Sequence, residues 1–193
     1  MRKLPLIYLI LFLIFWIVLA IDPISRKMWL VENVLLIIFL LVLIFTYKWF
    51  KFSNTSYTLI LLFSILQTIG AHYTYSLVPF DFITNLFGFE RNHFDRLVHF
   101  SFGFLLAYPF REFLLRKEEL KSKFWSYYFP IEMAFATGAI YEIIEWQYAV
   151  NSDSDAGHAF LGSQGDIWDA QKDMFLATLG AIIATTIVSS LKK

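Results

Sequence analysis

The stretches LPLIYLILFLIFWIVLAI, from Leu4 to Ile21, and LVENVLLIIFLLVLIFTY, from Leu30 to Tyr47, decide the fold. Each is close to the roughly 20 apolar residues that a helix needs to cross the hydrocarbon core of a bilayer. Their apolar residues form nearly continuous runs, whereas a helix on the surface of a water-soluble core would show an apolar stripe. The two stretches therefore predict membrane-spanning helices.

The composition of the whole chain agrees with a lipid environment. Of the 193 residues, 58% are hydrophobic and only 17% are charged, whereas soluble domains contain about 25% charged residues. The chain has no cysteine, which excludes disulfides, thiolate metal ligands and cysteine nucleophiles. Its formal net charge is zero, so we expect no nucleic acid partner.

Hydropathy predicts about six transmembrane helices in a single domain that covers residues 1–193. The fold class that we expect is all-α, a polytopic integral membrane helical bundle. The run after Arg2 and Lys3 is longer than the apolar part of a signal peptide and lacks a small-x-small cleavage site, so we expect a retained first span. The expected spans are residues 4–21, 30–47, 57–78, 94–115, 124–150 and 173–191.

Basic residues predict the orientation of these spans. If the amino terminus is cytoplasmic, most of the 16 Lys and Arg residues fall in cytoplasmic segments, as the positive-inside rule requires. Both termini are then cytoplasmic. The polar connection 151–168 between the last two spans lies outside.

This topology brings ionisable residues to one membrane face. The third span carries one of them in its outer half, the fourth begins with two, the fifth ends with two, and the sixth begins with an acidic stripe. Charged groups inside spans usually face a cavity or one another. The residues are His72, Asp95, His99, Glu142, Glu145, Asp166, Asp169 and Asp173.

Their spacing places them on shared helix faces. Asp95 and His99 are four residues apart, and Glu142 and Glu145 are three apart. Carboxylates with imidazole suit a divalent metal, general acid–base chemistry or a cationic headgroup. We expect metal ligands at His72, Asp95, His99, Glu142 and Asp173. In an enzyme, His99 would be the base or a ligand and Asp95 would orient it, and the site would be completed by Glu142, Glu145, Asp169 and Asp173.

Each of these residues also has a structural interpretation. Asp166 with Asp169, and Asn92 with Asp95, could cap the starts of the last and fourth helices. Polar pairs such as Arg96 with Glu145 could simply hold helices together. Both interpretations stay open at this stage.

Three blocks resemble the YjdF-like family of bacterial inner-membrane proteins. They are Asp95-Arg96-Leu97-Val98-His99-Phe100, Tyr141-Glu142-Ile143-Ile144-Glu145-Trp146, and the run from Gly165 to Met174, GDIWDAQKDM. More distantly the pattern is similar to VanZ-like proteins, in which a glycine follows the last acidic helix, as Gly180 does here. The resemblance implies a multi-pass protein of the bacterial inner (plasma) membrane and the cell envelope, and leaves the chemistry open.

The function that we expect is an outward-facing His/Asp/Glu pocket that binds a divalent metal or the headgroup of an envelope lipid or glycolipid. An enzyme with this pocket would be a metal- or carboxylate-assisted hydrolase or transferase. The alternatives are a small transporter, or a structural or regulatory membrane subunit whose polar residues only hold helices together. A transporter would need polar groups in the cytoplasmic half of the spans, where they are sparse.

Overall fold

The fold was analysed in a computed structural model that describes residues 3–117, 120–152, 157 and 161–191. Every regular element in these ranges is a helix, which confirms the all-α prediction for the described chain. The chain divides into two compact units, Met1–Phe94 and Asp95–Lys193. The helices are α1 (Lys3–Leu19), α2 (Arg26–Thr46), α3 (Asn54–His72), α4 (Asp81–Phe87), α5 (Phe94–Lys117), α6 (Lys123–Asn151) and α8 (Asp169–Ser190).

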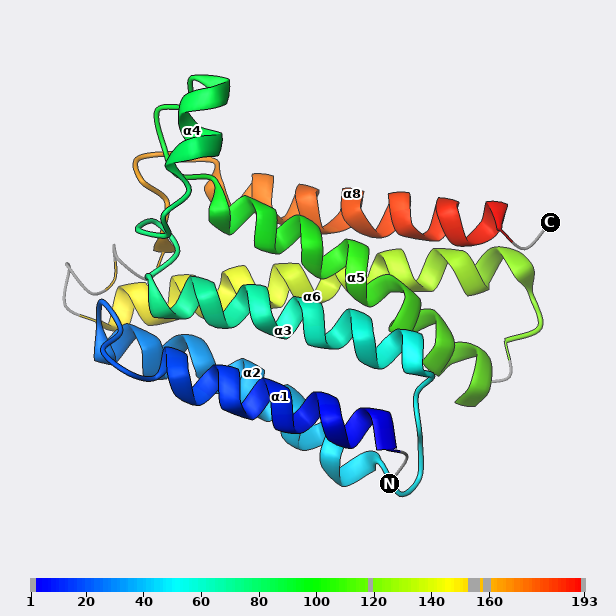
Figure 1. The fold of residues 1–193 in the computed structure, drawn as a ribbon. Helices are drawn as coiled ribbons and strands as arrows, with labels where there is room; N and C mark the ends of the chain where they lie inside the picture. The colour runs from blue at the N-terminus through cyan, green and yellow to red at the C-terminus, as the bar shows by residue number, and fades with distance from the viewer. Residues whose placement is uncertain (1–2, 118–119, 153–156, 158–160, 192–193) are drawn as a thin grey trace. The chain divides into compact units, whose positions relative to one another are not determined.

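In the first unit, α1 and α2 both pack along α3 (Figure 1). Serine side chains cap two of these helices: Ser25 accepts a hydrogen bond from the Met28 N–H of α2, and Ser53 accepts one from the Ser56 N–H of α3. Such caps satisfy backbone donors that the first helical turn leaves unpaired. The short connections between these helices are therefore fixed by local hydrogen bonds.

Helix α3 ends earlier than the predicted third span, which reached residue 78. It stops at His72, and Thr74 and Tyr75 then adopt left-handed φ values of 53° and 54°. The Tyr75 ring folds back onto Gly70, where a Cβ atom would lie 2.3 Å from the ring. The turn itself contains no proline or glycine, so nothing in the sequence indicates that the helix ends there. The prediction from hydropathy therefore extended the span too far.

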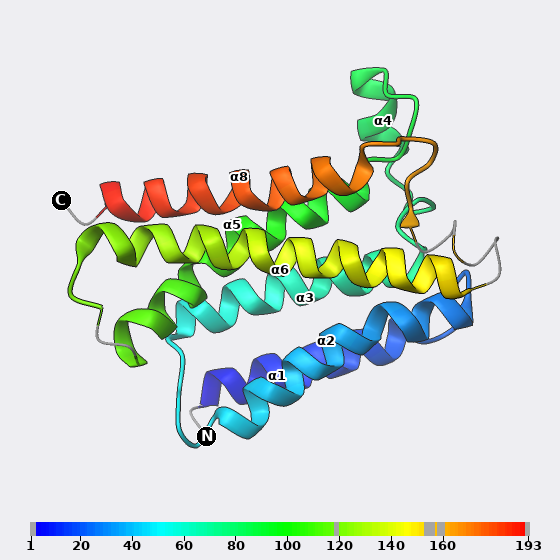
Figure 2. The same cartoon turned by 180° about the vertical axis from the view of Figure 1, so that it is seen from behind.

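In the second unit, α6 and α8 run side by side (Figure 2), and α5 crosses α8 at unusually short range. A Cβ atom on Gly103 would lie 1.7 Å from the Ala177 carbonyl oxygen. A Cβ atom on Gly180 would lie 2.2 Å from the Phe100 carbonyl oxygen. Only glycine leaves room for this backbone approach, which is a common way for helices to pack in membranes.

Small side chains form the centre of the second unit. Four alanines from α5, α6 and α8 make a buried cluster, and larger hydrophobic residues pack only at its margin. Small residues let helix backbones approach closely, so van der Waals contact and polar bonds can hold the helices together in lipid. The alanines are Ala107, Ala134, Ala181 and Ala184.

Polar side chains are buried, and long apolar side chains exposed, to an extent that is unusual in a soluble protein. The largest fully buried side chains are mostly polar, among them Asn33, Thr68 and Asp173. By contrast, long apolar side chains such as Ile14 and Leu11 on α1 are more than half exposed. Helices whose apolar faces point outward match a hydrocarbon solvent and leave the polar groups to one another.

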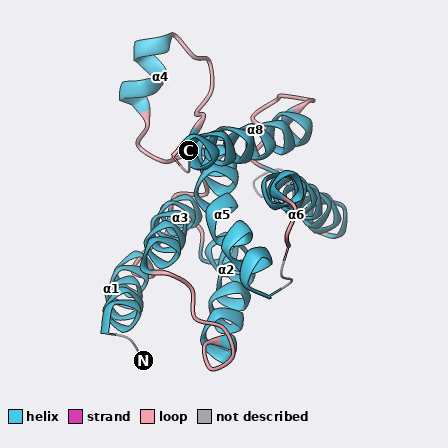
Figure 3. Ribbon diagram, turned by 90° about the vertical axis from the view of Figure 1, so that its right-hand side faces the viewer, coloured by secondary structure: helices cyan, strands magenta, loops and turns pink. Residues whose placement is uncertain are grey.

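Among the described residues, two helices are long and apolar enough to cross a membrane, α2 and α8, and α1 is a shorter apolar helix. Figure 3 shows the long helices of each unit roughly along their axes and the short α4 from the side. The polar residues on α3, α5 and α6 lower their hydropathy, as expected for helices that carry a site. Six spans and cytoplasmic termini remain predictions.

The glycine contacts generate a prediction about stability. Gly103→Ala or Gly180→Ala must push α5 away from α8, because the added methyl group meets a backbone oxygen. We expect each variant to lose at least about 1–3 kcal/mol, the usual effect of overpacking, measured as thermal unfolding in detergent. Gly138→Ala is the matched control, since its Cβ atom would meet the Ala177 Cβ at an ordinary 3.6 Å. Equal stability of all three variants would contradict the close approach.

Candidate functional site

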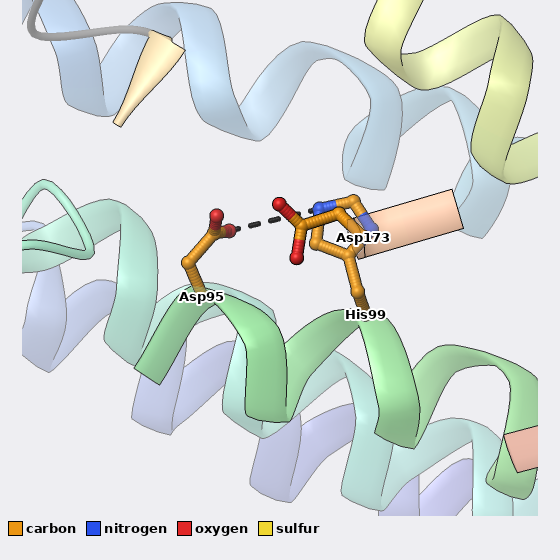
Figure 4. Close-up of side chains that lie close together, drawn as sticks. All are labelled: Asp95, His99 and Asp173. Atoms are coloured by element: carbon orange, nitrogen blue, oxygen red, sulfur yellow. Dashed lines mark ion pairs between the residues drawn. The ribbon is translucent and has the colours of Figure 1, made fainter. Parts of the chain in front are cut away.

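The candidate site lies within the second unit, where α5 meets the start of α8. Asp95 and His99 come from α5 and Asp173 from α8, and their side chains face a common space (Figure 4). One ligand atom from each residue lies within 4.8 Å of the others. We call these three residues, together with Glu142, the acidic–histidine cluster.

Helix periodicity explains why these residues meet. His99 precedes Gly103 by four residues, and Asp173 precedes Ala177 by four, so each residue lies one helical turn from the closest backbone contact. The approach of α5 to α8 at Gly103 therefore brings His99 and Asp173 together. Asp95 adds one further turn on the same face, with its Oδ1 3.7 Å from His99 Nε2.

Helix α6 contributes Glu142 to the cluster. Its Oε1 lies 3.5 Å from His99 Nε2, which is longer than a normal hydrogen bond but close enough for an ionic contact. The neighbouring Tyr141 ring meets the His99 ring edge-on at 5.7 Å between centroids. Three helices thus surround one imidazole.

The cluster is removed from solvent and contains carboxylate oxygens that lack hydrogen bonds. Asp173 is only 2% exposed and Glu142 only 9% exposed. Among the described residues, Asp173 Oδ1 and Glu142 Oε1 have no hydrogen-bond partner. Buried carboxylate oxygens without partners are unfavourable unless a proton or a cation compensates them. The cluster therefore contains two buried carboxylate oxygens that a proton or a cation could neutralise.

A second polar group beside the cluster has its partners in place. The Arg96 guanidinium contacts the carboxylates of Asp166 and Asp169, and the Lys172 ammonium lies 2.6 Å from Asp166 Oδ2. The hydrogen bond from Lys172, the N–H of Trp168 and Arg96 together hold the pKa of Asp166 well below its usual range. A lowered pKa means that this carboxylate stabilises the fold above the ordinary aspartate pKa of about 3.9 and loses that effect only as the pH falls below it.

The structure corrects the capping prediction for Asp166. Helix α8 begins at Asp169 with Trp168 at the N-cap position, so Asp166 lies outside the helix and accepts from the Trp168 N–H in a turn. A turn of this kind is a common alternative for aspartate. Asn92 accepts from the N–H of Phe94 in the same i, i+2 arrangement, and since α5 begins at Phe94, Asn92 also lies before the N-cap position that was predicted for it.

The remaining site predictions fall at different places. Glu145 is buried in α6 one turn after Glu142, and Asp169 is buried beside Arg96. His72 belongs to the first unit, where its Nδ1 lies 2.8 Å from the Leu19 carbonyl oxygen. A ligand role for His72 stays a prediction.

Two features of the site were not apparent from the sequence. A Cβ atom on Gly162 would lie 4.0 Å from Asp95 Oδ2, and its φ of 59° favours glycine. This places the backbone of the loop before α8 next to the cluster. The pairing of Arg96 with Asp166 and Asp169 was also missed, because the sequence suggested Glu145 as the partner. For the position of Gly162 next to Asp95, the only signal in the sequence was a glycine in a polar loop near acidic residues.

The fold and the site define a class, namely a helical membrane protein with a buried acidic–histidine cluster. The family described as "Predicted membrane protein (DUF2238)" matches residues 4–193. The chain is 37% identical over 165 residues to a protein named "Inner membrane protein YjdF" from Escherichia coli (strain K12), with 85% of this chain and 78% of the relative covered. The chain therefore belongs to this family of bacterial inner-membrane proteins.

These similarities confirm the YjdF-like resemblance and the location in the inner membrane. The more distant likeness to VanZ-like proteins stays a prediction from the motifs. No solved structure matches the chain. Inferences about the site therefore depend on its own geometry.

The Arg96 pairs generate a prediction about stability. Arg96→Met leaves Asp166 and Asp169 without the cation that joins α5 to the start of α8, so we expect a clear drop in unfolding temperature. Lys172→Met is the control, since it also contacts Asp166 but its side chain is 48% exposed, whereas that of Arg96 is 17% exposed. Surface ion pairs contribute little, so the control should lose less. Because the pKa of Asp166 is lowered, the difference between Arg96→Met and the unmodified protein should persist from pH 8 to pH 5. Equal losses in both variants would contradict a joining role for Arg96.

Proposed function

We propose that the second unit is a membrane-embedded binding site for a divalent metal ion, held by Asp95, His99 and Asp173. The observation that carries the proposal is the Oδ1 of Asp173, which has no hydrogen bond within the described chain although Asp173 is almost fully buried and shares a possible ligand group with Asp95 and His99. A bound cation would compensate this buried Asp173 oxygen. A mobile proton is the other candidate partner, and the experiment below separates the two.

The chemistry of the donor set narrows the metal. Imidazole with carboxylates suits first-row ions such as Zn²⁺ or Mn²⁺, and the chain offers no thiolate. The ligand atoms lie within 4.8 Å of one another, a spread that small side-chain rotations can close to metal–ligand distances of about 2.0–2.3 Å. Glu142, 3.5 Å from His99, would then be either a fourth ligand or a nearby base.

A site with three protein ligands has an obvious use in the envelope. Three ligands would leave coordination positions open, as in catalytic metal sites, where a metal lowers the pKa of a bound water and so supplies a hydroxide nucleophile. We therefore propose a hydrolase or transferase that acts on the phosphate or carbonyl group of a lipid or glycolipid headgroup. The predicted topology would place this chemistry at the outer face of the inner membrane.

A second candidate function is supported by the Arg96 pairs. In that case the polar residues only hold α5, α6 and α8 together, as in a structural or regulatory subunit. The pairs of Arg96 with Asp166 and Asp169 fit this role, since both charges are compensated. They do not account for Asp173, whose partner is missing. The two candidates therefore make opposite predictions for an Asp173 variant.

The test is a metal-binding measurement on the full chain in detergent. The chelator-treated protein is titrated with Zn²⁺ and with Mn²⁺ by calorimetry, and bound metal is counted by mass spectrometry of the elements. Removing a group that only supports a ligand typically weakens metal affinity about 10–100-fold. We expect His99→Ala and Asp173→Asn to weaken metal affinity by more than this, because each removes a proposed ligand. Asp81→Asn is the matched control, because Asp81 is an exposed carboxylate in the first unit.

Thermal unfolding distinguishes the candidates further. Metal at 100 times its Kd should stabilise the unmodified protein by about 2.7 kcal/mol, and should leave Asp173→Asn unchanged. If the residues only hold helices together, Asp173→Asn alters stability equally with and without metal, and the unmodified protein binds none. If a proton is the partner of the carboxylates, stability varies with pH and is indifferent to metal. Either of these last two results would overturn the proposal.

A further inference from the structure

The first unit contains a cavity of about 550 Å³ among α1, α2 and α3. Its walls are largely aliphatic and aromatic, with residues such as Leu9 and Phe12 from α1, Leu40 from α2 and Leu61 from α3. This volume is in the range of cavities that bind small molecules, about 300–1,000 Å³. None of its lining residues belongs to the acidic–histidine cluster, so it is a separate feature of the molecule.

Polar groups within the wall are already used inside the protein. The Ser64 hydroxyl donates to the Ile60 carbonyl oxygen of its own helix. The Tyr8 hydroxyl lies 3.0 Å from the Thr58 hydroxyl oxygen, which links α1 to α3. These bonds leave mainly hydrocarbon for an occupant to contact along most of the cavity.

One end of the cavity is positively charged. Lys48 and Lys51, in the connection between α2 and α3, both line it, and none of the described lining residues is acidic. The Lys51 ammonium lies 5.6 Å from the centroid of the Tyr47 ring, which fixes its position by a cation–π contact. Tyr57, at the start of α3, completes an aromatic and basic rim of the kind found where helices leave the hydrocarbon.

We propose that this cavity binds an anionic phospholipid of the membrane. The acyl chain would occupy the apolar part between α1 and α2, and the headgroup phosphate would lie at Lys48 and Lys51. The apolar wall favours a hydrocarbon chain. The two lysines favour a negative headgroup, because no acidic residue in the described part of the chain lines the cavity with them. Because α2 is long and apolar enough to span a membrane, this end of the cavity would lie near the level of the lipid headgroups.

The proposal is tested by lipid binding to the full chain. The protein is exchanged into detergent with added phosphatidylglycerol or phosphatidylcholine, and bound lipid is counted by native mass spectrometry and followed by thermal unfolding. We expect phosphatidylglycerol to bind and to raise the unfolding temperature, and phosphatidylcholine to do so much less. Lys48→Gln with Lys51→Gln should weaken phosphatidylglycerol binding about 30-fold, at about 5-fold per lysine near an anionic surface.

Two further variants complete the test. Lys27→Gln with Lys123→Gln removes the same charge at exposed positions that do not line the cavity, so it should bind phosphatidylglycerol like the unmodified protein. Leu9→Trp fills the apolar part and should abolish binding of both lipids while circular dichroism stays helical. Equal binding of the two lipids, or equal losses in both lysine pairs, would overturn the proposal. So would unchanged binding by folded Leu9→Trp, which would place the lipid elsewhere.

Discussion

The contact on which the second unit depends is the approach of the α5 backbone to the α8 backbone. At Gly103 and Gly180 each helix faces a carbonyl oxygen of the other with no side chain between them. In lipid, where apolar side chains gain little by leaving the solvent, such close packing is a main source of helix association. The alanine cluster continues the same contact toward the other end of the helices. Small residues thus take the place that large hydrophobic side chains hold in a soluble core.

This spacing also determines the chemistry. His99 and Asp173 each lie one helical turn from the closest backbone contact, so their side chains enter the same buried space. Glu142 of α6 also contacts His99 there. Membrane interiors tolerate ionisable groups when they are paired or functional. Arg96 with Asp166 and Asp169 is the paired case, because both signs of charge are present. Asp173 and Glu142 differ from this pair, because they lie near one imidazole and each has a buried oxygen without a hydrogen bond to any described residue. The two polar groups therefore differ in how their charges are compensated.

Much of this arrangement could be predicted from the sequence. The spacing of Asp95 and His99 indicates one helix face, and alternating spans bring Asp173 to the same end, which is how the structure places them. Other features depend on contacts that periodicity does not encode. The turn at Thr74 and Tyr75 has no proline or glycine and follows from a ring packed on Gly70. Helix α8 begins four residues before the predicted span, and Asp166 binds Lys172 and Arg96 instead of capping the helix. Long-range partners of this kind become visible only when the loop is placed in space.

The backbone nature of the α5–α8 contact has a consequence for how this family can change. In most protein cores a bulkier residue can be accommodated when its neighbour becomes smaller, so substitutions arise in compensating pairs. Here the atoms that a methyl group would strike at positions 103 and 180 are the carbonyl oxygens of Ala177 and Phe100. No exchange of the opposing side chain can remove a carbonyl oxygen. A smaller side chain at the facing residue therefore cannot compensate a substitution at either glycine, and the separation of His99 from Asp173 is fixed by the two backbones.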